Sequence, residues 1–163
     1  MRDPAARAIL APTMSEWERA AELRSRLVEV ALSWQERFGV APAITSALSE
    51  LDAALLVGMS EDEYCSDCNS RTAVTRGCDF THRGCRYQVK ANRPSGRPGS
   101  FVTLVGKANN YDWDKLIWIL YDRGYTIQEA WEWHVGEYRR RFETVGRLSP
   151  THMRLGRRLL PGG

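Results

Sequence analysis

The chain has 163 residues and a mass of 18.6 kDa, which is enough for one globular domain. Its residues are 43% hydrophobic and 26% charged, a balance that excludes wholesale disorder and collagen-like or mucin-like chains. No run approaches about 18 consecutive apolar residues, so the sequence predicts no membrane-spanning helix. The charged N-terminus is not followed by an apolar segment, so we expect no secretory signal and a cytoplasmic protein.

The formal net charge of +3 is unevenly distributed along the chain. Residues 1–63 carry 6 basic and 11 acidic side chains, whereas residues 64–163 carry 17 basic and 9 acidic ones. Arginine outnumbers lysine by 20 to 3, and the planar guanidinium group matches the geometry of phosphate. The basic C-terminal part therefore favours a polyanionic partner, although a GC-rich coding sequence would produce the same excess of arginine.

The first secondary-structure signal is a long helix. Residues 1–14 are expected to form a flexible lead-in. Ser15 and Glu18 then have the spacing of a capping box. Apolar residues at helical spacing follow and predict a helix over about 16–38, which Gly39 ends.

A second, shorter helix is predicted after the first. Pro42 is a typical helix-opening residue, and the apolar stripe behind it predicts a helix over about 43–57 that ends at Gly58. Residues 59–70 are acidic and polar, which by composition favours a loop.

The later part of the chain is typical of a sheet. The pattern predicts strands over 72–80, 86–91, 101–105, 116–121 and 125–133. Residues 81–85 are expected to connect the first two strands as a hairpin, and residues 122–124 to turn the last two. We therefore expect an α/β domain over residues 15–146, with N-terminal helices packed on a mixed, mainly antiparallel sheet. A basic C-terminal tail over 147–163 would follow it.

Polar residues gather on one face of the predicted strand over 86–91. Arg86, Gln88 and Lys90 share this face because side chains alternate along a strand. If the hairpin pairs as predicted, Asp79 on the preceding strand lies near Gln88 and Lys90. A carboxylate, an amide oxygen and an ammonium group at one point suit a hard cation and an activated water.

At these residues the sequence resembles the PD-(D/E)XK nuclease superfamily. The signature of that superfamily is an acid at a strand end, a short hairpin, and then (D/E/Q)-x-K. Here the acid is Asp79, and Gln88-Val89-Lys90 has the QxK form found in Mrr-like restriction enzymes. Glu50 matches the glutamate that such families often place on the first core helix.

The resemblance covers roughly residues 44–134 and implies a restriction-endonuclease-like fold. The usual core has a helix between its third and fourth strands, but about ten residues separate Gly106 from Leu116 here. We therefore expect this helix to be missing, reduced to a turn, or supplied by the C-terminal part.

The resemblance also implies hydrolysis of DNA phosphodiester bonds with Mg²⁺ or Mn²⁺. Asp79, Glu50 and Gln88 would hold the metal, and Lys90 would orient or deprotonate the attacking water. Restriction or defence against foreign DNA is the biological setting that it implies.

The alternative function is a non-catalytic module on the same fold that binds nucleic acid or a protein partner. It is favoured by the neutral Gln88, which leaves the metal site one charge short. A chain this small, with no evident specificity domain, is compatible with a homodimer or with a partner subunit.

Four cysteines form a second pattern. Cys65, Cys68, Cys78 and Cys85 have a spacing that suits a tetrahedral structural zinc site, in which His82 would be able to replace one ligand. The alternative is that Cys78 is a small buried strand residue and that Cys65 and Cys68 are loop thiols. Disulfides are the poorer explanation in a cytoplasmic protein. A zinc-stabilised structural protein is therefore a third interpretation.

Basic residues near the predicted site are expected to contact the DNA backbone. They are Arg86, Arg93, Arg97 and Lys107. The segment 92–99, rich in glycine and proline, would track phosphates or would be an ordinary connection between strands. The run over 139–141 would be a second backbone contact or a solvated helix face.

Overall fold

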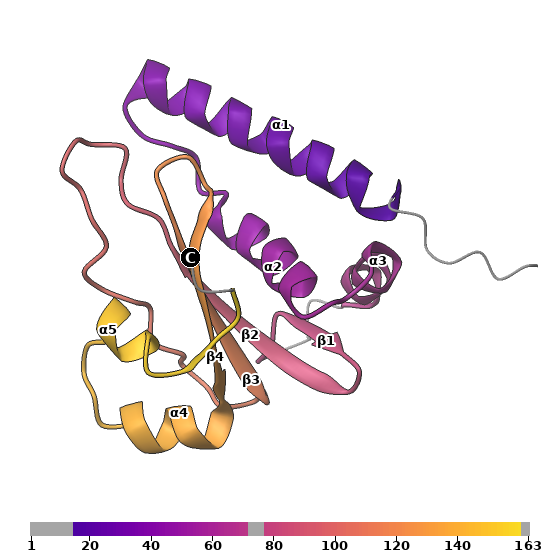
Figure 1. The fold of residues 1–163 in the computed structure, drawn as a ribbon, viewed down its shortest axis with the longest axis vertical. Helices are drawn as coiled ribbons and strands as arrows, with labels where there is room; N and C mark the ends of the chain where they lie inside the picture. Colours follow the sequence, from indigo (N-terminus) through magenta and orange to yellow (C-terminus); the bar gives the residue numbers. More distant parts are fainter. Residues whose placement is uncertain (1–14, 72–76, 161–163) are drawn as a thin grey trace, which may run out of the picture.

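The computed structural model describes residues 15–71 and 77–160. The predicted lead-in over 1–14 and the beginning of the first predicted strand lie outside the described residues. The elements are α1 (Ser15–Phe38), α2 (Thr45–Leu56), α3 (Glu61–Ser70), β1 (Phe80–His82), β2 (Cys85–Asn92), β3 (Lys115–Tyr121), β4 (Ile127–His134), α4 (Val135–Phe142), α5 (Pro150–Met153) and β5 (Arg157–Arg158). The predicted α/β class is confirmed (Figure 1).

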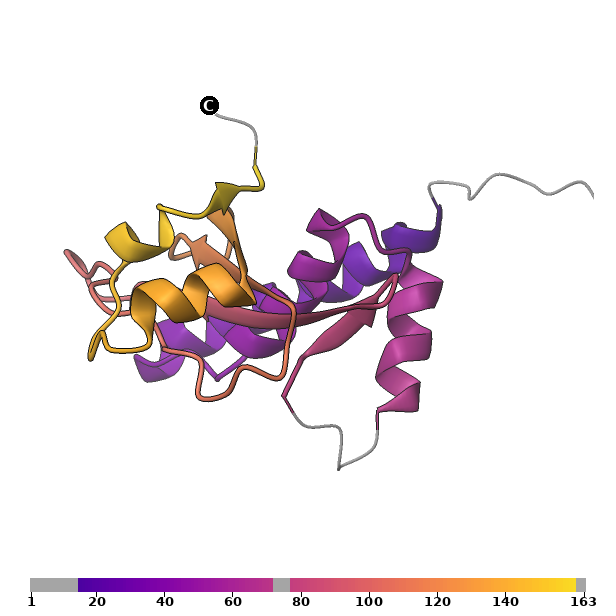
Figure 2. The ribbon, with the colours of Figure 1, turned by 90° about the horizontal axis from the view of Figure 1, so that it is seen from below.

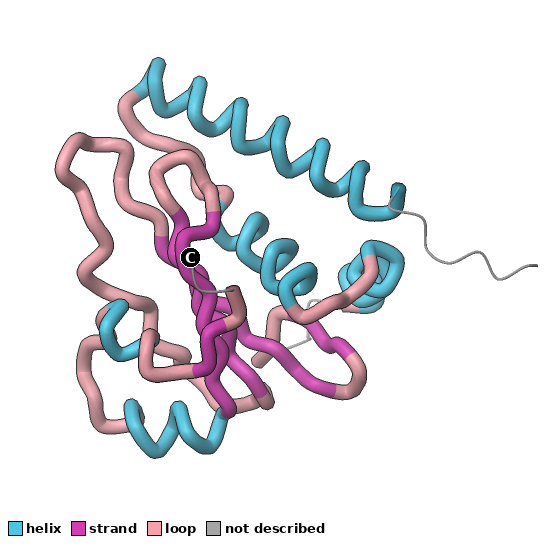
Figure 3. Tube along the Cα trace, viewed as in Figure 1, coloured by secondary structure: helices cyan, strands magenta, loops and turns pink. Residues whose placement is uncertain are grey.

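The strands form one mixed sheet in the order β1-β2-β3-β4-β5. β2 and β3 are parallel, and every other neighbouring pair is antiparallel. A parallel pair needs a connection that returns along the sheet, and residues 93–114 provide it as a long loop (Figure 3). The crossover thus contains no helix, and α4 from the C-terminal part packs on the sheet instead.

The sheet is buried on both faces by helices from the two ends of the chain. α1, α2 and α3 lie on one side, and α4 and α5 lie on the other (Figure 1). Alternation along β3 sends Ile117 into a core with Ala53 of α2 and Trp118 into a core with Tyr138 of α4. This double burial explains why β3 is a nearly continuous apolar run.

α1 contributes little to these cores although apolar residues recur at helical spacing along it. Ala31 is fully buried, whereas Leu23, Val30, Trp34 and Phe38 are each more than half exposed. The apolar stripe that predicts the helix is therefore mostly a surface feature of the described chain.

A polar network attaches α1 to the rest of the domain. Asp52 of α2 is 4% exposed and accepts 2.8 Å hydrogen bonds from Nε and Nη2 of Arg24. The hydroxyl of Tyr121 donates a third bond of 2.6 Å to the same carboxylate. Arg24 also donates to the backbone oxygen of Tyr125. One buried carboxylate thus joins α1, α2 and β3.

The predicted loop over 59–70 is wrong, because residues 61–70 form α3. Ser60 accepts a hydrogen bond from the backbone N–H of Glu63, whose carboxylate accepts one from the N–H of Ser60. This capping box begins a helix that buries none of its residues, so it lacks an apolar stripe. Figure 2 shows α3 beside the β1–β2 hairpin.

The predicted strand over 101–105 is also wrong. Val105 forms a single antiparallel bridge with Leu148, and the remaining residues of the segment lie outside any strand. Both edges of β2 are already paired, with β1 and β3, so this segment has no edge of β2 to join. Phe101 is left 77% exposed.

The first hairpin is tighter than predicted. β1 begins at Phe80, and the turn consists of Arg83 and Gly84, both with positive φ, instead of the five residues 81–85. Residues 77–79 lie before the strand.

Residues in the predicted basic tail contribute to the domain. Leu148 and Met153 are buried in the core on the α4 side, and β5 pairs with β4. Within the two described ranges, no helix is long and apolar enough to cross a bilayer.

Candidate active site

Asp79 lies directly before β1 and reaches across to β2. Its backbone N–H donates a 2.7 Å hydrogen bond to the oxygen of Tyr87, which fixes it beside the neighbouring strand. Its carboxylate Oδ2 accepts hydrogen bonds of 2.6 Å from Nε2 of Gln88 and from the backbone N–H of Val89. The predicted proximity of Asp79 and Gln88 is therefore confirmed.

The surroundings of Asp79 oppose its ionisation. Burial raises the pKa of Asp79 above its ordinary value, and this effect exceeds the opposing ones. The hydrogen bond from Val89 and the positive charges of Lys90 and Arg71 act to lower the same pKa. A further cation at this carboxylate would favour the ionised form.

Lys90 lies two residues beyond Gln88 on β2 and therefore on the same face of the sheet. It is half-buried, and its positive charge acts to lower the pKa of Asp79. The crossover passes close by, since a Cβ added at Gly106 would lie 4.0 Å from Cδ of Lys90. In the described part of the chain, Lys115 forms an ion pair with Glu132 but Lys90 forms none.

Glu50 lies on α2, which packs on the Val89 face of the sheet, whereas Gln88 and Lys90 belong to the opposite face. Its Oε2 lies 3.3 Å from Nη1 of Arg71, which also pairs with Asp67 at 2.9 Å. Burial raises the pKa of Glu50, and the negative charge of Asp79 raises it further, while Arg71 acts in the opposite direction. The negative charge of Asp79 thus acts on the carboxylate of Glu50 on α2.

Arg71 was not among the residues predicted for the site. Arg71 immediately follows α3, and this helix sets the direction in which its side chain points toward Glu50. Because residues 59–70 were predicted to form a loop, no sequence signal placed Arg71 beside Glu50. Asp67 completes this side of the site, because its Oδ1 accepts the backbone N–H of Thr81 at 3.1 Å. Asp67 therefore ties α3 both to Arg71 and to β1.

The donor set at Asp79 fits a small hard cation. Mg²⁺ and Mn²⁺ prefer oxygen ligands, and Mg²⁺ commonly uses one or two carboxylates and keeps several waters. Asp79 offers a carboxylate and Gln88 an amide oxygen in direct contact with it, whereas Glu50 is related to Asp79 through charge alone. Among residues 15–71 and 77–160, no group of three His, Cys, Asp or Glu side chains forms a metal-binding arrangement.

The four cysteines do not come together. Cys65 and Cys68 are exposed on α3. Cys85 packs with the core on the α2 side of the sheet, whereas Cys78 packs with the core on the α4 side. This arrangement does not fit a four-thiolate zinc ion, and α3 is held to β1 through Asp67 instead.

The basic residues predicted to contact DNA are dispersed. Arg86 pairs with Asp114 at 3.1 Å, and Nζ of Lys107 donates to the backbone oxygens of Glu143 and Val145 near the end of α4. Arg93 and Arg97 lie beyond the opposite end of β2 from Arg86, and Arg97 is exposed. They do not form one continuous surface with the site.

No protein-family model matches this chain, and no curated protein matches it either.

Proposed function

We propose that this protein hydrolyses DNA phosphodiester bonds with Mg²⁺ or Mn²⁺ bound at Asp79, as its resemblance to the PD-(D/E)XK superfamily implies. The observation that carries the proposal is the contact of Asp79 with Gln88 at 2.6 Å, with Lys90 on the same face of β2. The hairpin brings together residues that are nine and eleven positions apart in the sequence.

The electrostatics of the site supports a cation. The pKa values of Asp79 and Glu50 are both raised, so the ionised form of each is disfavoured by its surroundings. A divalent cation bound at Asp79 would relieve this cost, and its charge would also favour the ionised form of Glu50. The positive charge of Arg71, which pairs with Glu50, also favours the ionised form of Glu50.

Each residue of the site has a distinct part in the chemistry. The metal would supply Lewis acidity toward a phosphoryl oxygen. Asp79 and Glu50 would hold it, and Gln88 would act as a neutral ligand and keep Asp79 in position. Lys90 would orient the attacking water or take its proton, and its charge would stabilise the negative charge that develops on phosphate.

Cleavage of plasmid DNA tests this function. Purified protein is incubated with supercoiled plasmid and Mg²⁺ or Mn²⁺, beside an EDTA control and the variant Lys90→Met. Methylated, unmethylated and single-stranded substrates are all included because the target is not specified by the site. Arg19→Met is the matched control, since Arg19 is an exposed cation on α1.

We expect metal-dependent nicking by the wild type and by Arg19→Met, and no nicking by a folded Lys90→Met. Equal nicking by Lys90→Met, or nicking that persists in EDTA, would contradict the proposed mechanism. Cleavage of both strands would further require a homodimer, a partner subunit or a second binding event. Restriction of foreign DNA is the setting in which such a nuclease would act.

The second candidate function is a nucleic-acid-binding or partner-binding module without catalysis. It is favoured by the amide N–H of Gln88, which donates a hydrogen bond to Oδ2 of Asp79. This bond occupies a lone pair of the carboxylate that a bound metal would need. The absence of Mn²⁺ binding, together with retained DNA binding in a fluorescence anisotropy titration, would support this function over hydrolysis.

A further inference from the structure

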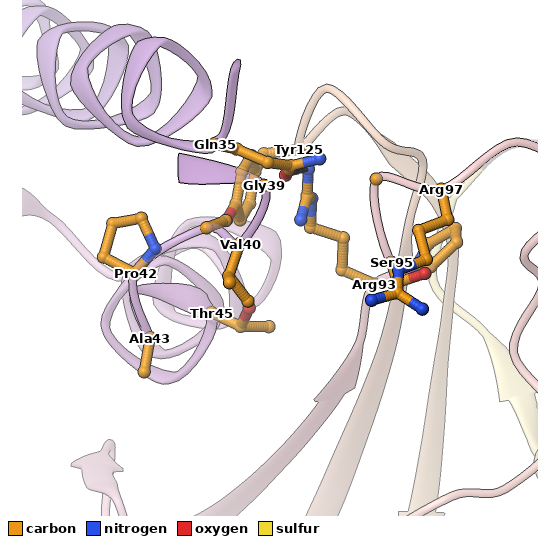
Figure 4. Close-up of a pocket in the computed structure, with 13 residues that line it drawn as sticks. Gln35, Gly39, Val40, Pro42, Ala43, Thr45, Arg93, Ser95, Arg97 and Tyr125 are labelled. Carbon is orange, nitrogen blue, oxygen red and sulfur yellow. Dashed lines mark hydrogen bonds between the residues drawn. The ribbon is translucent and has the colours of Figure 1, made fainter. Parts of the chain in front are cut away.

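A cavity of about 520 Å³ lies away from Asp79, where the C-terminal end of α1, the α1–α2 connection and the start of the crossover meet (Figure 4). Its volume lies in the range of small-molecule sites. One wall is apolar and includes Val40, Pro42 and Ala43, and the opposite side carries Arg93 and Arg97. None of the residues that line it carries a carboxylate.

Arg93 is held in place by neutral groups. Its Nε and Nη2 donate to the backbone oxygen of Arg123, and Nη2 also donates to Oε1 of Gln35 at 2.8 Å. The guanidinium lies over the ring of Tyr125, 4.2 Å from the ring centroid. Figure 4 shows Arg93 extending from the crossover toward Gln35 and Tyr125. The side chain is therefore ordered while its charge is left uncompensated by these partners.

Other ordered arginines of the described chain are neutralised differently. Arg24, Arg86, Arg154 and Arg157 each pair with a carboxylate. Near the cavity, Arg123 donates to the backbone oxygen of Gly96. The hairpin residue Asp122 is already bound by the backbone N–H groups of Gly124 and Thr126. The charged residues that line the cavity are thus two arginines, Arg93 and Arg97.

The backbone of Tyr125 is strained in a way that shapes the cavity. Its φ is +63°, in the left-handed region that bulky side chains rarely adopt, and it is 1% exposed. Arg24 donates to its backbone oxygen at 2.8 Å, which helps to hold this conformation. The strained residue places its ring beneath Arg93. An unfavourable backbone conformation maintained beside a cavity is a common feature of functional sites.

We propose that this cavity binds a phosphate-bearing small molecule of nucleotide size. Arg93 and Arg97 would contact the phosphate through charge-assisted hydrogen bonds, and the apolar wall formed by Val40 and Pro42 would contact the organic part. Arg93 follows the C-terminal end of β2, five residues beyond Gln88. The cavity is thus separate from the site at Asp79 and does not depend on hydrolysis there.

Isothermal titration calorimetry with three probes tests this inference. Adenosine 5′-monophosphate, adenosine and inorganic phosphate are each titrated into the full-length protein without divalent metal. We expect saturable binding of the monophosphate at one site, with affinity about tenfold or more above that of either fragment. Equal affinity for adenosine, or no binding of the monophosphate at millimolar concentration, would overturn the proposal. Inorganic phosphate that binds as tightly as the monophosphate would overturn the nucleotide-sized part of it.

Variants locate the binding. Arg97→Ala removes one of the two arginines at the cavity, and it changes an exposed side chain, so the fold should be unaffected. Arg93→Lys keeps the positive charge but loses the planar guanidinium. Each variant should bind the monophosphate about tenfold more weakly. Arg140→Ala on α4 and Asp79→Asn should bind as the wild type does. Loss of binding in Arg140→Ala, or in Asp79→Asn, would place the ligand elsewhere and overturn the assignment.

Discussion

The hydroxyl of Tyr121 on β3 donates a 2.6 Å hydrogen bond to Oδ2 of Asp52 on α2, across the buried interface of helix and sheet. The same carboxylate binds Arg24 of α1 through two hydrogen bonds. Burial, followed by the negative charge of Asp52, raises the pKa of Tyr121, so the phenol remains a donor. α1, whose large apolar residues are mostly exposed, is therefore held by this network together with the small cluster that Ala31 forms with Leu48 and Tyr125.

Removing either partner of this pair should destabilise the fold to different extents. Tyr121→Phe leaves Asp52 bound to Arg24 and should lower the free energy of unfolding by about 1–2 kcal/mol. Asp52→Ala leaves the guanidinium of Arg24 without a carboxylate and should cost about 3 kcal/mol, because this side chain is 22% exposed. Urea denaturation measures both, and a larger effect for Tyr121→Phe would contradict this order.

Gln88→Glu tests how the charge of the site is balanced. The substitution removes the amide that donates to Asp79 and places a third carboxylate in the field shared with Glu50. Without divalent metal, the free energy of unfolding should fall by about 1–3 kcal/mol, and millimolar Mn²⁺ should restore it. Thermal unfolding with and without Mn²⁺ measures this change. Gln128→Glu, at an exposed position on β4, should show neither effect.

Glu50 should give stability an unusual dependence on pH. Because burial and Asp79 raise the pKa of Glu50, the folded chain binds this proton more tightly than the unfolded chain. The contribution is present below the unfolded pKa of about 4.3 and is lost as the pH rises through the higher folded value. The free energy of unfolding of Glu50→Gln, relative to wild type, should therefore increase between about pH 4 and pH 7.

Glu129 provides the control of opposite sign for that experiment. The hydrogen bond from Arg154 holds the pKa of Glu129 below its ordinary value. Its contribution to stability is therefore present above the unfolded pKa and is lost as the pH falls through the lower folded value. The free energy of unfolding of Glu129→Gln, relative to wild type, should therefore fall as the pH rises. If this difference changed with pH in the same direction for Glu129→Gln and Glu50→Gln, the raised pKa of Glu50 would be refuted.

Lys107 should act on stability instead of DNA binding. Its ammonium group donates to the oxygens of Glu143 and Val145 at 2.8 and 3.0 Å, near the C-terminal end of α4. Lys107→Met should lower the free energy of unfolding by about 1–2 kcal/mol, because two charge-assisted hydrogen bonds are lost. Circular dichroism during urea denaturation measures it. Wild-type stability with weakened DNA binding would instead favour the role predicted from the sequence.

Local sequence signals predicted the elements that carry a regular apolar pattern. The alternation over 86–91 and the apolar run over 116–121 correspond to β2 and β3 within a residue or two. The hairpin then brings Asp79 to Gln88, as expected from the pairing of the two predicted strands, although the observed turn has two residues instead of five.

Elements without such a pattern were not predictable in the same way. No residue of α3 is fully buried and Tyr64 is only partly buried against the core, so the capping box at Ser60 and Glu63 was the main sign of a helix in a polar segment. The β-branched segment over 101–105 has strand propensity but no free edge of β2 to pair with, which is a property of the whole sheet. Local propensity cannot register such an effect.

The same reasoning explains which parts of the site were missed. Arg71 reaches Glu50 because α3 directs the chain there, and Lys107 is occupied by α4, which follows it by nearly thirty residues. Both outcomes depend on long-range packing. The spacing of the cysteines likewise could not show that Cys78 and Cys85 lie against opposite faces of the sheet.

The most direct test of the proposed active site is a titration of Mn²⁺ with the protein. Electron paramagnetic resonance measures binding as the loss of the signal of the free ion. The wild type and Asp62→Asn, a change at an exposed aspartate of α3, should bind the ion alike. Asp79→Asn should bind it at least about tenfold more weakly while remaining folded. Identical titrations for Asp79→Asn and the wild type would contradict a metal centre at Asp79.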